Sequence, residues 1–397
     1  MERLRIGIVA GEASGDLLAS HLVAALKARL PQAQFEGIGG PKMIAAGVHS
    51  LFPMETLAVR GYVEALRSLP AILRIRRKLT RHFLATRPDL FIGVDAPDFN
   101  LGLARTLKAA GIPTFQYVGP SVWAWRGGRL RKIRRAVSHM LLLFPFEPPL
   151  YEAAGIPATY VGHPLADMLP LHPDRTAARE ALRLPPQGEM VALLPGSRES
   201  ELALMGDLFV QAAQQIHRLR PGVSFLVPLI TRKTRDLFEA ALARQQAHDL
   251  PLRILFGHAH EAMTAANVVL VASGTATLEA ALLKRPMVIT YRVPALTYRL
   301  MWPRRYLPYV GLPNVLAGRF LVPELLQDEA TPDNLAQAVC NLLAAPRLCG
   351  ALEAHFVRMH LLLRQGNAEK VADTVVRHLE AHRPAAMKAF DAEGCTS

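Results

Sequence analysis

Two acidic residues follow a short apolar run in the first quarter of the chain. The run Asp89–Val94 is expected to be a buried strand; Asp95 follows it directly, and Asp98 comes three residues later. A carboxylate at a strand end can accept a proton from a substrate hydroxyl if its pKa is raised, so Asp95 is a candidate general base. Alternatively, Asp95 or Asp98 caps the next helix, whose first turn suits Pro97. The D-x-x-D spacing, without other acidic clusters, argues against a divalent metal.

The loop Leu193–Arg198 (LLPGSR) has the residues of an anion-binding site. It follows an expected strand, Met190–Leu194, and precedes a helix. The backbone N–H groups of Gly196 and Ser197 would therefore lie near a helix N-terminus, where anions are favoured. The guanidinium of Arg198 adds a planar, permanently charged fork that suits a diphosphate. The alternative is that Arg198 is an ordinary surface charge.

A second loop of this kind is Ala272–Glu279 (ASGTATLE), which again joins a strand to a helix. Small residues, Gly274 and Thr275 among them, would let a phosphate reach the helix N-terminus, where N–H groups and the helix dipole favour negative charge. Glu279 lies one turn into the helix and could accept both hydroxyls of a ribose, as an acidic residue does in dinucleotide sites. Its alternative role is a favourable charge in the first helical turn.

The loop Gly11–Asp16 (GEASGD) also joins a strand to a helix but fits no standard phosphate loop. Its two glycines permit a close backbone approach or a positive φ, and Ser14 or Asp16 can cap the helix. It is neither G-x-G-x-x-G nor a P-loop, and its two acids would repel a phosphate. We therefore expect either a ligand-contacting loop outside the nucleotide cradle or a capped turn.

Two other patterns suggest ligands less strongly. The segment His258–Glu261 (HAHE) could belong to a metal site, but no third or fourth ligand has a recognisable spacing. Trp123 and Trp125 precede a basic run, as in proteins that stack nucleic-acid bases, although two aromatic residues in one loop also suit packing or substrate contact. We therefore expect no metal, no cofactor and no nucleic-acid partner.

The net charge of +13 is concentrated in three segments. Seven Lys or Arg residues lie in 54–84 against two acids, and six lie in each of 126–135 and 285–319, which contain no acid. Such patches attract nucleic acid, anionic lipid headgroups or phosphorylated substrates, or form a plain solvated surface. Residues 62–73 read as an amphipathic basic segment that Pro70 should kink or split. It either faces the core or rests on an anionic bilayer, through Arg67, Arg74, Arg77 and Lys78.

The elements that position these loops alternate between strands and helices. Continuous apolar runs are typical of parallel strands that are covered on both faces, and their alternation with helices indicates doubly wound sheets. Ligands of such sheets bind at the carboxyl ends of the strands. The other expected strands are Arg5–Ala10, Thr114–Val118, His139–Phe144, Ser224–Pro228, Leu252–Phe256, Val268–Ala272 and Met287–Tyr291, and expected helices include Leu17–Leu30, Phe99–Ala110, Arg129–Val137 and Glu199–Leu219.

The length of 397 residues favours two domains, and a Pro-rich segment at 162–173 is a plausible hinge. We expect one Rossmann-like domain at 1–168, a second at 169–345, C-terminal helices at 346–382 that pack on the first domain or swap between chains, and a flexible tail at 383–397. The three cysteines match no ligand spacing and indicate a reducing compartment. No signal peptide and no membrane-length apolar run is recognised, so a cytoplasmic protein is expected.

Nine motifs follow one another along the chain: GEASGD, IGVDAPDFN, YVGPSVWAWR, FPFEPPLYE, YVGHPLAD, LLPGSRESE, ASGTATLEA, YR at Tyr291–Arg292, and GLPNVLAGR. Each motif alone is modest, but the ordered set, from about residue 5 to residue 380, closely resembles the lipid-A-disaccharide synthase family. The resemblance implies a family 19 glycosyltransferase of GT-B fold, an α/β fold in which two Rossmann-like parallel-sheet domains face a cleft.

The resemblance also implies a reaction. The enzyme would join UDP-2,3-diacylglucosamine to 2,3-diacylglucosamine 1-phosphate (lipid X), giving the β-1,6-linked lipid A disaccharide 1-phosphate and UDP. It would work without a metal at the anionic cytoplasmic face of the inner membrane of Gram-negative bacteria, as a peripheral protein. Its acylated substrates require it to reach the bilayer without spanning it.

On this basis we expect a single inverting displacement. Asp95 would be the base, while Arg198 and the N–H groups around Gly274 and Thr275 would stabilise the departing UDP in place of a cation. The other expected substrate contacts are Ser14 and Asp16 on the first-domain wall, Asp98, Ser197, Glu279 at the ribose, Arg292, and Asn314 in the GLPN loop.

Two other functions stay open from the sequence. One is a different GT-B enzyme, such as a UDP-sugar epimerase or a glycosyltransferase that acts on a non-lipid acceptor. The other is a nucleic-acid or membrane-surface binding protein that uses only the basic patches, although such a protein has no need of paired strand-end loops. The acyl-chain length of the substrates and the oligomeric state, a homodimer included, are not determined by the sequence.

Overall fold

The computed structural model describes residues 4–57, 62–124, 127–294, 298–299, 302 and 305–382, with side chains from residue 69 onward in the second range. The chain forms two compact units, Met1–Asp167 with Leu363–Ser397 and Met168–Leu362. The predicted contact through the side chain of Arg67, the residue Trp125 and the predicted tail at 383–397 lie outside the described residues. Each unit is built around one parallel sheet.

The first unit has a seven-stranded sheet in the order β3-β2-β1-β4-β5-β6-β7. Every strand pair is parallel, with Ile6 opposite Leu90 and Val94 opposite Tyr117. The strands are β1 (Arg5–Ala10), β2 (Gln34–Ile38), β3 (Val48–Ser50), β4 (Leu90–Val94), β5 (Thr114–Tyr117), β6 (His139–Leu142) and β7 (Ala158–Tyr160). The strand order reverses between β1 and β4, and in doubly wound sheets this reversal marks the ligand crevice.

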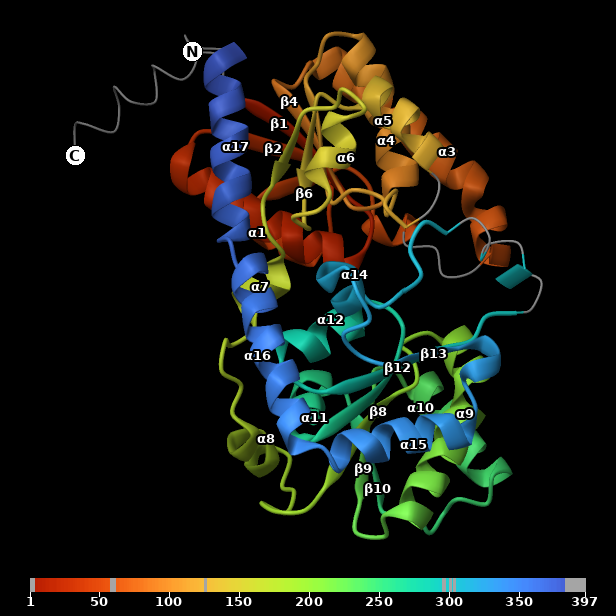
Figure 1. Cartoon of the computed structure of the whole chain (residues 1–397). Helices are drawn as coiled ribbons and strands as arrows, with labels where there is room; N and C mark the ends of the chain where they lie inside the picture. Colours follow the sequence, from red (N-terminus) through yellow and green to blue (C-terminus); the bar gives the residue numbers. More distant parts are fainter. Residues whose placement is uncertain are drawn as a thin grey trace. The chain divides into compact units, whose positions relative to one another are not determined.

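Helices cover both faces of this sheet, with α3, α4 and α5 packed on one face and α1, α2 and α17 on the other (Figure 1). The first face buries Leu79 and Phe83 of α3 against Phe91 of β4. The helices of the unit are α1 (Ala13–Arg29), α2 (Pro41–Ala45), α3 (Tyr62–Thr86), α4 (Pro97–Ala109), α5 (Leu130–Ala136), α6 (Pro148–Glu152), α7 (Pro164–Met168) and α17 (Asn367–His382), with short 3-10 turns at Met54–Thr56 and Gly127–Arg129.

The helix α3 is amphipathic, as its sequence predicts, but Pro70 does not split it. Leu79 and Phe83 are fully buried four residues apart, while Arg74, Arg77 and Lys78 are exposed. Each buried side chain contributes about 1.5–3 kcal/mol. That burial offsets the one hydrogen bond lost at Pro70, and α3 continues through it from Tyr62 to Thr86.

The second unit has a six-stranded parallel sheet in the order β10-β9-β8-β11-β12-β13. The strands are β8 (Met190–Leu194), β9 (Ser224–Leu229), β10 (Leu252–Phe256), β11 (Val268–Ala272), β12 (Met287–Tyr291) and β13 (Glu324–Leu326). β8 and β11 are buried along their whole length, which explains their continuous apolar sequences. Here the order reverses between β8 and β11, so these two strands form the switch point of the second sheet.

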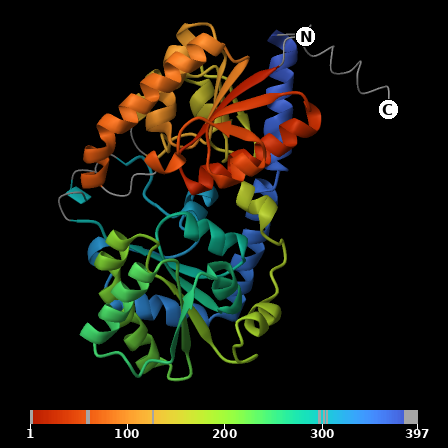
Figure 2. The same ribbon diagram turned by 180° about the vertical axis from the view of Figure 1, so that it is seen from behind.

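On one face of the second sheet α9, α10 and α15 pack together, and on the other lie α8, α11 and α12 (Figure 2). The helices are α8 (Arg175–Ala181), α9 (Glu199–Leu219), α10 (Arg232–Arg244), α11 (Ala259–Ala265), α12 (Thr275–Leu282), α14 (Leu312–Ala317), α15 (Pro332–Leu343) and α16 (Pro346–Leu363). The expected C-terminal helical segment consists of α16, almost all of which belongs to the second unit, and α17, which belongs to the first. No single helix in the described ranges is long and apolar enough to cross a membrane.

Candidate functional site

The loops after β1 and β4 meet at the switch point of the first sheet. The hydroxyl of Ser14 donates a hydrogen bond to Oδ2 of Asp95 over 3.4 Å. Gly11 makes this approach possible, since a Cβ at that position would lie 2.6 Å from the Cβ of Ala96. The glycine of GEASGD thus lets the first loop lie against the loop that carries the candidate base, and Asp95 itself is half-buried there.

Asp16 is committed to the protein's own backbone. Its buried carboxylate accepts hydrogen bonds from the N–H groups of Gly40 (2.9 Å), Lys42 (3.1 Å) and Met43 (3.0 Å). These N–H groups belong to the first turn of α2, so Asp16 caps α2. The predicted capping of α1 by Ser14 or Asp16 is wrong, since α1 begins after Glu12 without a side-chain cap. Direct contact of Asp16 with a ligand stays a prediction, which the burial of the Asp16 carboxylate disfavours.

The backbone around the candidate base is in an unusual conformation. Asp95 and Ala96 have φ angles of 51° and 40°, and Val118, at the end of the adjacent strand β5, has a φ of 70°. Left-handed conformations cost non-glycine residues about 1–3 kcal/mol each, and a β-branched residue there is a clear outlier. The predicted strand Thr114–Val118 accordingly ends at Tyr117. Strain of this kind gathers at active sites, which favours a functional role for this corner.

Asp98, the second acid of the D-x-x-D pair, has a different environment. Its side chain is 85% exposed and accepts a hydrogen bond of 2.7 Å from the guanidinium of Arg129. An exposed ion pair of this kind adds little stability. Because the Asp98 side chain is so exposed, its carboxylate stays accessible to a ligand. The structure thus separates the two acids, with Asp95 packed at the strand end and Asp98 on the surface of α4. The role of Asp98 in substrate binding stays a prediction.

At the switch point of the second sheet, the loop after β8 binds the carboxylate of Glu201, a residue of α9 that the sequence did not single out. The N–H groups of Ser197 and Arg198 both donate to Oε2 of Glu201, over 2.9 and 3.2 Å. The Arg198 guanidinium lies 3.3 Å from the other Glu201 oxygen, yet 76% of the Arg198 side chain is exposed. Of the two N–H groups expected to bind an anion, that of Ser197 is therefore satisfied internally, and the exposed guanidinium of Arg198 is the available cationic group. Gly196 allows this turn with a φ of 132°.

The loop after β11 fits the predicted phosphate approach. Gly274 precedes α12 with a φ of 138°, which only glycine adopts readily, and a Cβ there would meet no atom within 4 Å. The helix begins without a side-chain cap and has no acid in its first turn. Thr275, its first residue, is exposed. The start of α12 therefore presents uncapped N–H groups and the positive end of the helix dipole.

Glu279 lies in α12 beside a histidine from the HAHE segment. Nε2 of His260 is 3.3 Å from Oε2 of Glu279, and this hydrogen bond raises the pKa of His260. His258 instead lies 3.7 Å from Glu261. Among the residues that the structure describes, no three His, Cys, Asp or Glu side chains are grouped to hold a metal. The HAHE segment thus contributes a partner for Glu279.

Two residues expected to contact substrate are held by hydrogen bonds to nearby residues. Arg292 donates to the carbonyl oxygen of Ala330 over 2.5 Å. Asn314 is fully buried, and its amide makes four hydrogen bonds that hold the GLPN turn to the start of β13; the partners are N–H of Leu321 (2.7 Å), N–H and C=O of Val322 (both 2.9 Å) and Oε1 of Glu324 (2.8 Å). Both residues shape the loop in this structure. Substrate contact by Arg292 and donor contact by Asn314 stay predictions.

Comparison with known proteins decides between the functions that the sequence left open. The family model for lipid-A-disaccharide synthetase matches residues 6–370. The lipid-A-disaccharide synthase of Methylobacillus flagellatus is 59% identical over 375 residues, which are 94% of this chain and 99% of that protein. The chain belongs to the lipid-A-disaccharide synthetase family. It is therefore a glycosyltransferase, and the readings as an epimerase or as a pure binding protein are not favoured.

Solved structures confirm the fold of this synthetase family member. A UDP-GlcNAc 2-epimerase from Neisseria meningitidis bound to UDP-GlcNAc matches with a TM-score of 0.59 and 10% identity, covering 96% of this chain and 99% of that one. Anabaena HepE in complex with UDP and glucose matches with a TM-score of 0.56 and 14% identity, covering 94% and 100%. At such identities the likeness concerns the fold alone, which is the predicted GT-B class of two parallel-sheet α/β units.

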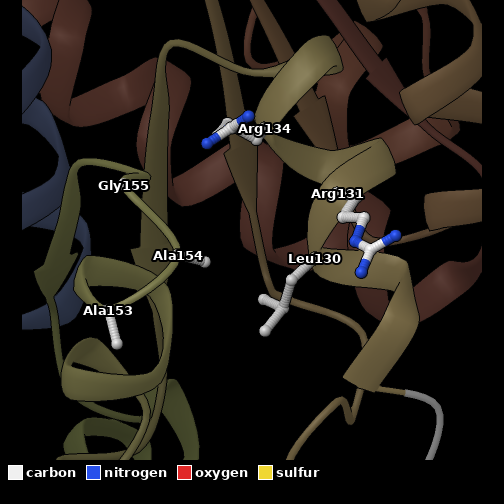
Figure 3. Close-up of a pocket in the computed structure, with 6 residues that line it drawn as sticks. All are labelled: Leu130, Arg131, Arg134, Ala153, Ala154 and Gly155. Atoms are coloured by element: carbon white, nitrogen blue, oxygen red, sulfur yellow. The ribbon is translucent and has the colours of Figure 1, made fainter.

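Two pockets lie on the basic helices of the first unit. One, of about 350 Å³, lies between α5 and the turn after α6, with Arg131 and Arg134 on one side and Ala153–Gly155 on the other (Figure 3). The second, of about 310 Å³, lies between α3 and α4 and is lined by Arg76, Arg77, Thr80, Arg81, Gly102, Arg105 and Thr106. Neither lining includes an acid, so both pockets are suited to anions.

Proposed function

We propose that this glycosyltransferase condenses UDP-2,3-diacylglucosamine with 2,3-diacylglucosamine 1-phosphate to give the β-1,6-linked lipid A disaccharide 1-phosphate and UDP. Family membership over residues 6–370 supports the substrates. The observation that carries the chemistry is the position of the motif loops at the switch points of the two sheets. GEASGD and DAPD follow β1 and β4, while LLPGSR and ASGTATLE follow β8 and β11.

In the first unit, Asp95 is the proposed general base. The hydroxyl of Ser14 donates to one carboxylate oxygen, and the other oxygen is the proposed acceptor of the proton from the acceptor 6-hydroxyl. As that proton moves to Asp95, the acceptor oxygen forms a bond to the anomeric carbon of the donor, and the bond from that carbon to the UDP oxygen breaks. One displacement of this kind inverts the anomeric configuration.

In the second unit, Arg198 and the start of α12 are the proposed sites of the departing UDP. The exposed guanidinium can bind both phosphates in the bidentate manner that arginine favours. The uncapped N-terminus of α12, which begins at Thr275, adds a second source of positive potential. Together they perform the task that a divalent cation performs elsewhere, while Glu279 accepts hydrogen bonds from the ribose hydroxyls.

The basic helices of the first unit are proposed to contact the anionic cytoplasmic face of the inner membrane. Arg74, Arg77 and Lys78 are exposed on α3, and the arginine-lined pockets continue this surface across α4 and α5. Each basic side chain near an anionic membrane contributes about 1 kcal/mol to binding. Such a surface would keep a peripheral enzyme at the bilayer that holds its acylated substrates.

Vesicle sedimentation tests the membrane contact. The protein should sediment with phosphatidylcholine vesicles that contain phosphatidylglycerol, and less with phosphatidylcholine alone. The double variant Arg77→Glu, Lys78→Glu should lose this difference, while Arg218→Glu, a charge reversal at an exposed position of α9, should keep it. Equal sedimentation of the two variants would contradict the proposed surface.

The reaction is tested with purified protein, both acylated substrates and EDTA. UDP and disaccharide 1-phosphate should form together, and the Asp95→Asn variant should lose about 10²–10⁴-fold in kcat while it still binds UDP. UDP-glucosamine without acyl chains serves as the matched donor that the proposal expects to fail. Product formation from the deacylated donor at the same rate, or near-normal turnover by Asp95→Asn, would refute the substrate class or the base assignment respectively.

A further inference from the structure

We infer that Asn100 and Gln116 are positioning residues that fix the direction of the Asp95 carboxylate, an inference that rests on the proposed role of Asp95 as the base. Both side chains are completely buried. Asn100 comes from the first turn of α4 and Gln116 from β5, so they approach Asp95 from different elements.

The two side-chain amides converge on one backbone atom. Nδ2 of Asn100 donates to the carbonyl oxygen of Asp95 over 2.8 Å, and Nε2 of Gln116 donates to the same oxygen over 3.0 Å. The N–H of Asp95 in turn donates to the carbonyl of Tyr117 over 2.9 Å. Because both ends of Asp95 are held, its left-handed backbone conformation, with a φ of 51°, is held too, and this conformation sets the direction in which the side chain leaves the backbone.

The same amides also tie the surrounding strand ends together. Asn100 donates to the carbonyl oxygens of Val9 and Val94, both over 3.3 Å, which links the ends of β1 and β4. Gln116 donates to the carbonyl of Val118 over 3.2 Å. One glutamine therefore supports two left-handed corners, at Asp95 and at Val118, that end the adjacent strands β4 and β5.

The remaining atoms of these amides show that the arrangement serves donation. Within the described part of the chain, Oδ1 of Asn100 and Oε1 of Gln116 are buried and have no hydrogen-bond partner. Among the described residues the contacts of these two side chains with the corner are therefore made by their amide N–H groups. Gly93 makes the room, since a Cβ there would lie 2.7 Å from the Gln116 oxygen and 2.8 Å from the Asn100 Cβ.

The test replaces each amide by an apolar side chain of similar size, as Gln116→Met and Asn100→Leu. Both variants remove the donors and, at the same time, the orphaned oxygens. Misdirection of a catalytic group by about 1 Å costs on the order of 10²-fold in rate. We therefore expect kcat to fall about tenfold to a hundredfold, with the affinity for UDP unchanged because UDP is proposed to bind the second unit.

The matched control is Thr114→Val. Thr114 is fully buried at the other end of β5, and its hydroxyl donates to the carbonyl of Ala136 over 2.8 Å. This variant also loses a buried hydrogen bond on the same strand but should keep the wild-type kcat. If Gln116→Met lost no more kcat than Thr114→Val at equal folded concentration, the inference would be overturned.

A double variant separates this inference from the base assignment. If Gln116 acts through Asp95, adding Gln116→Met to Asp95→Asn should cause no further loss of kcat, because the group being positioned is already gone. A second loss of the same factor would show that Gln116 acts independently and would overturn the inference. Wild-type turnover by Asp95→Asn alone would instead refute the proposed base, and the inference would fall with it.

Discussion

Nε2 of His260 lies 3.3 Å from Oε2 of Glu279, the residue proposed to bind the ribose of the donor. The two residues come from different helices of the second unit, α11 and α12. Hydrogen bonding to Glu279 raises the pKa of His260 above its ordinary value of 6.5. A protonated His260 therefore competes with ribose hydroxyls for the same carboxylate, and the competition depends on pH.

The first prediction is that donor affinity falls as the solution is acidified through the pKa of His260. At high pH the imidazole is neutral and Glu279 is free to accept from ribose, whereas at low pH the imidazolium holds the carboxylate. Isothermal titration of UDP-diacylglucosamine should give a larger Kd at pH 6 than at pH 8.5. His260→Gln should flatten this dependence, and an equally steep dependence in that variant would show that another group titrates.

The same pair makes a linked prediction about stability. A histidine whose pKa is raised on folding stabilises the protein below its unfolded pKa, and this contribution disappears as the pH rises through the raised value. The free energy of unfolding of wild type should therefore exceed that of His260→Gln most at pH 5–6, and the difference should shrink towards pH 9. Urea titrations at several pH values measure it.

The strands at both switch points could be read from the sequence because they are wholly buried. β4, β8 and β11 are apolar without interruption, which is the pattern of a parallel strand covered on both faces. The strands β2, β3, β7 and β13 were not predicted. β3, β7 and β13 have only three residues each, and β7 and β13 have no buried position. β2 and β3 are only partly buried, so none of the four strands has a continuous apolar sequence.

The candidate site was predictable as a set of loops but not as a set of contacts. Asp95, Arg198 and Glu279 could be chosen because each lies in or just after a strand-to-helix turn. Their partners could not, since pairing across elements depends on tertiary geometry: no local pattern brings His260 to Glu279 or Gln116 to Asp95. Glu201 matches one half of a capping-box pattern, an acid at the third position of a helix. The other half is absent, because the N-cap position is occupied by Arg198 instead of Ser or Thr.

The second prediction concerns Arg198 and Glu201, which should act in opposite directions. Arg198→Ala removes the exposed guanidinium and should lower kcat by about 10²–10³-fold, as expected for loss of one electrostatic contact to a leaving group. Glu201→Gln keeps an oxygen that can accept from the N–H groups of Ser197 and Arg198 but removes a negative charge beside the proposed diphosphate site. UDP should then bind several-fold more tightly.

Steady-state kinetics checks the kcat of Arg198→Ala, and fluorescence or calorimetric titration with UDP checks the affinity of Glu201→Gln, each against wild type. The control is Glu239→Gln in α10, which also removes one carboxylate paired with an arginine, Arg235, and should leave UDP affinity unchanged. Weaker UDP binding by Glu201→Gln would mean that the turn needs the charge of Glu201 to keep its shape.

The third prediction concerns Glu147, a buried carboxylate that the sequence reading did not single out. Burial raises the pKa of Glu147 to about 7, against hydrogen bonds from the N–H groups of Phe144 and Leu143 and from Trp123. The folded state then holds a proton that the unfolded state releases between about pH 4.5 and 7, so stability falls as the pH rises across that window. The loss above pH 7 is about 3 kcal/mol.

Glu147→Gln keeps an oxygen that can accept from Phe144, over the 2.9 Å seen here, and does not ionise. Relative to wild type, the Glu147→Gln variant should therefore be more stable at pH 8 than at pH 5, with a larger free energy of unfolding. Thermal melts at the two pH values give the comparison. A wild-type melting curve that does not move between pH 5 and pH 8 relative to that of Glu147→Gln would contradict the raised pKa.

The fourth prediction tests whether GEASGD must lie against the loop of the proposed base. A Cβ added at Gly11 would lie 2.6 Å from the Cβ of Ala96, closer than two carbon atoms can remain, so one loop must move. Gly11→Ala should destabilise the protein by about 1–3 kcal/mol, the usual cost of overpacking, and should lower kcat through Asp95.

Gly222→Ala is the matched control, since a Cβ there meets nothing within 4 Å. It should leave both stability and kcat near wild type. If Gly11→Ala lost stability but kept its kcat per folded molecule, the contact between the two loops would be a matter of packing, and the position of Asp95 would not depend on it.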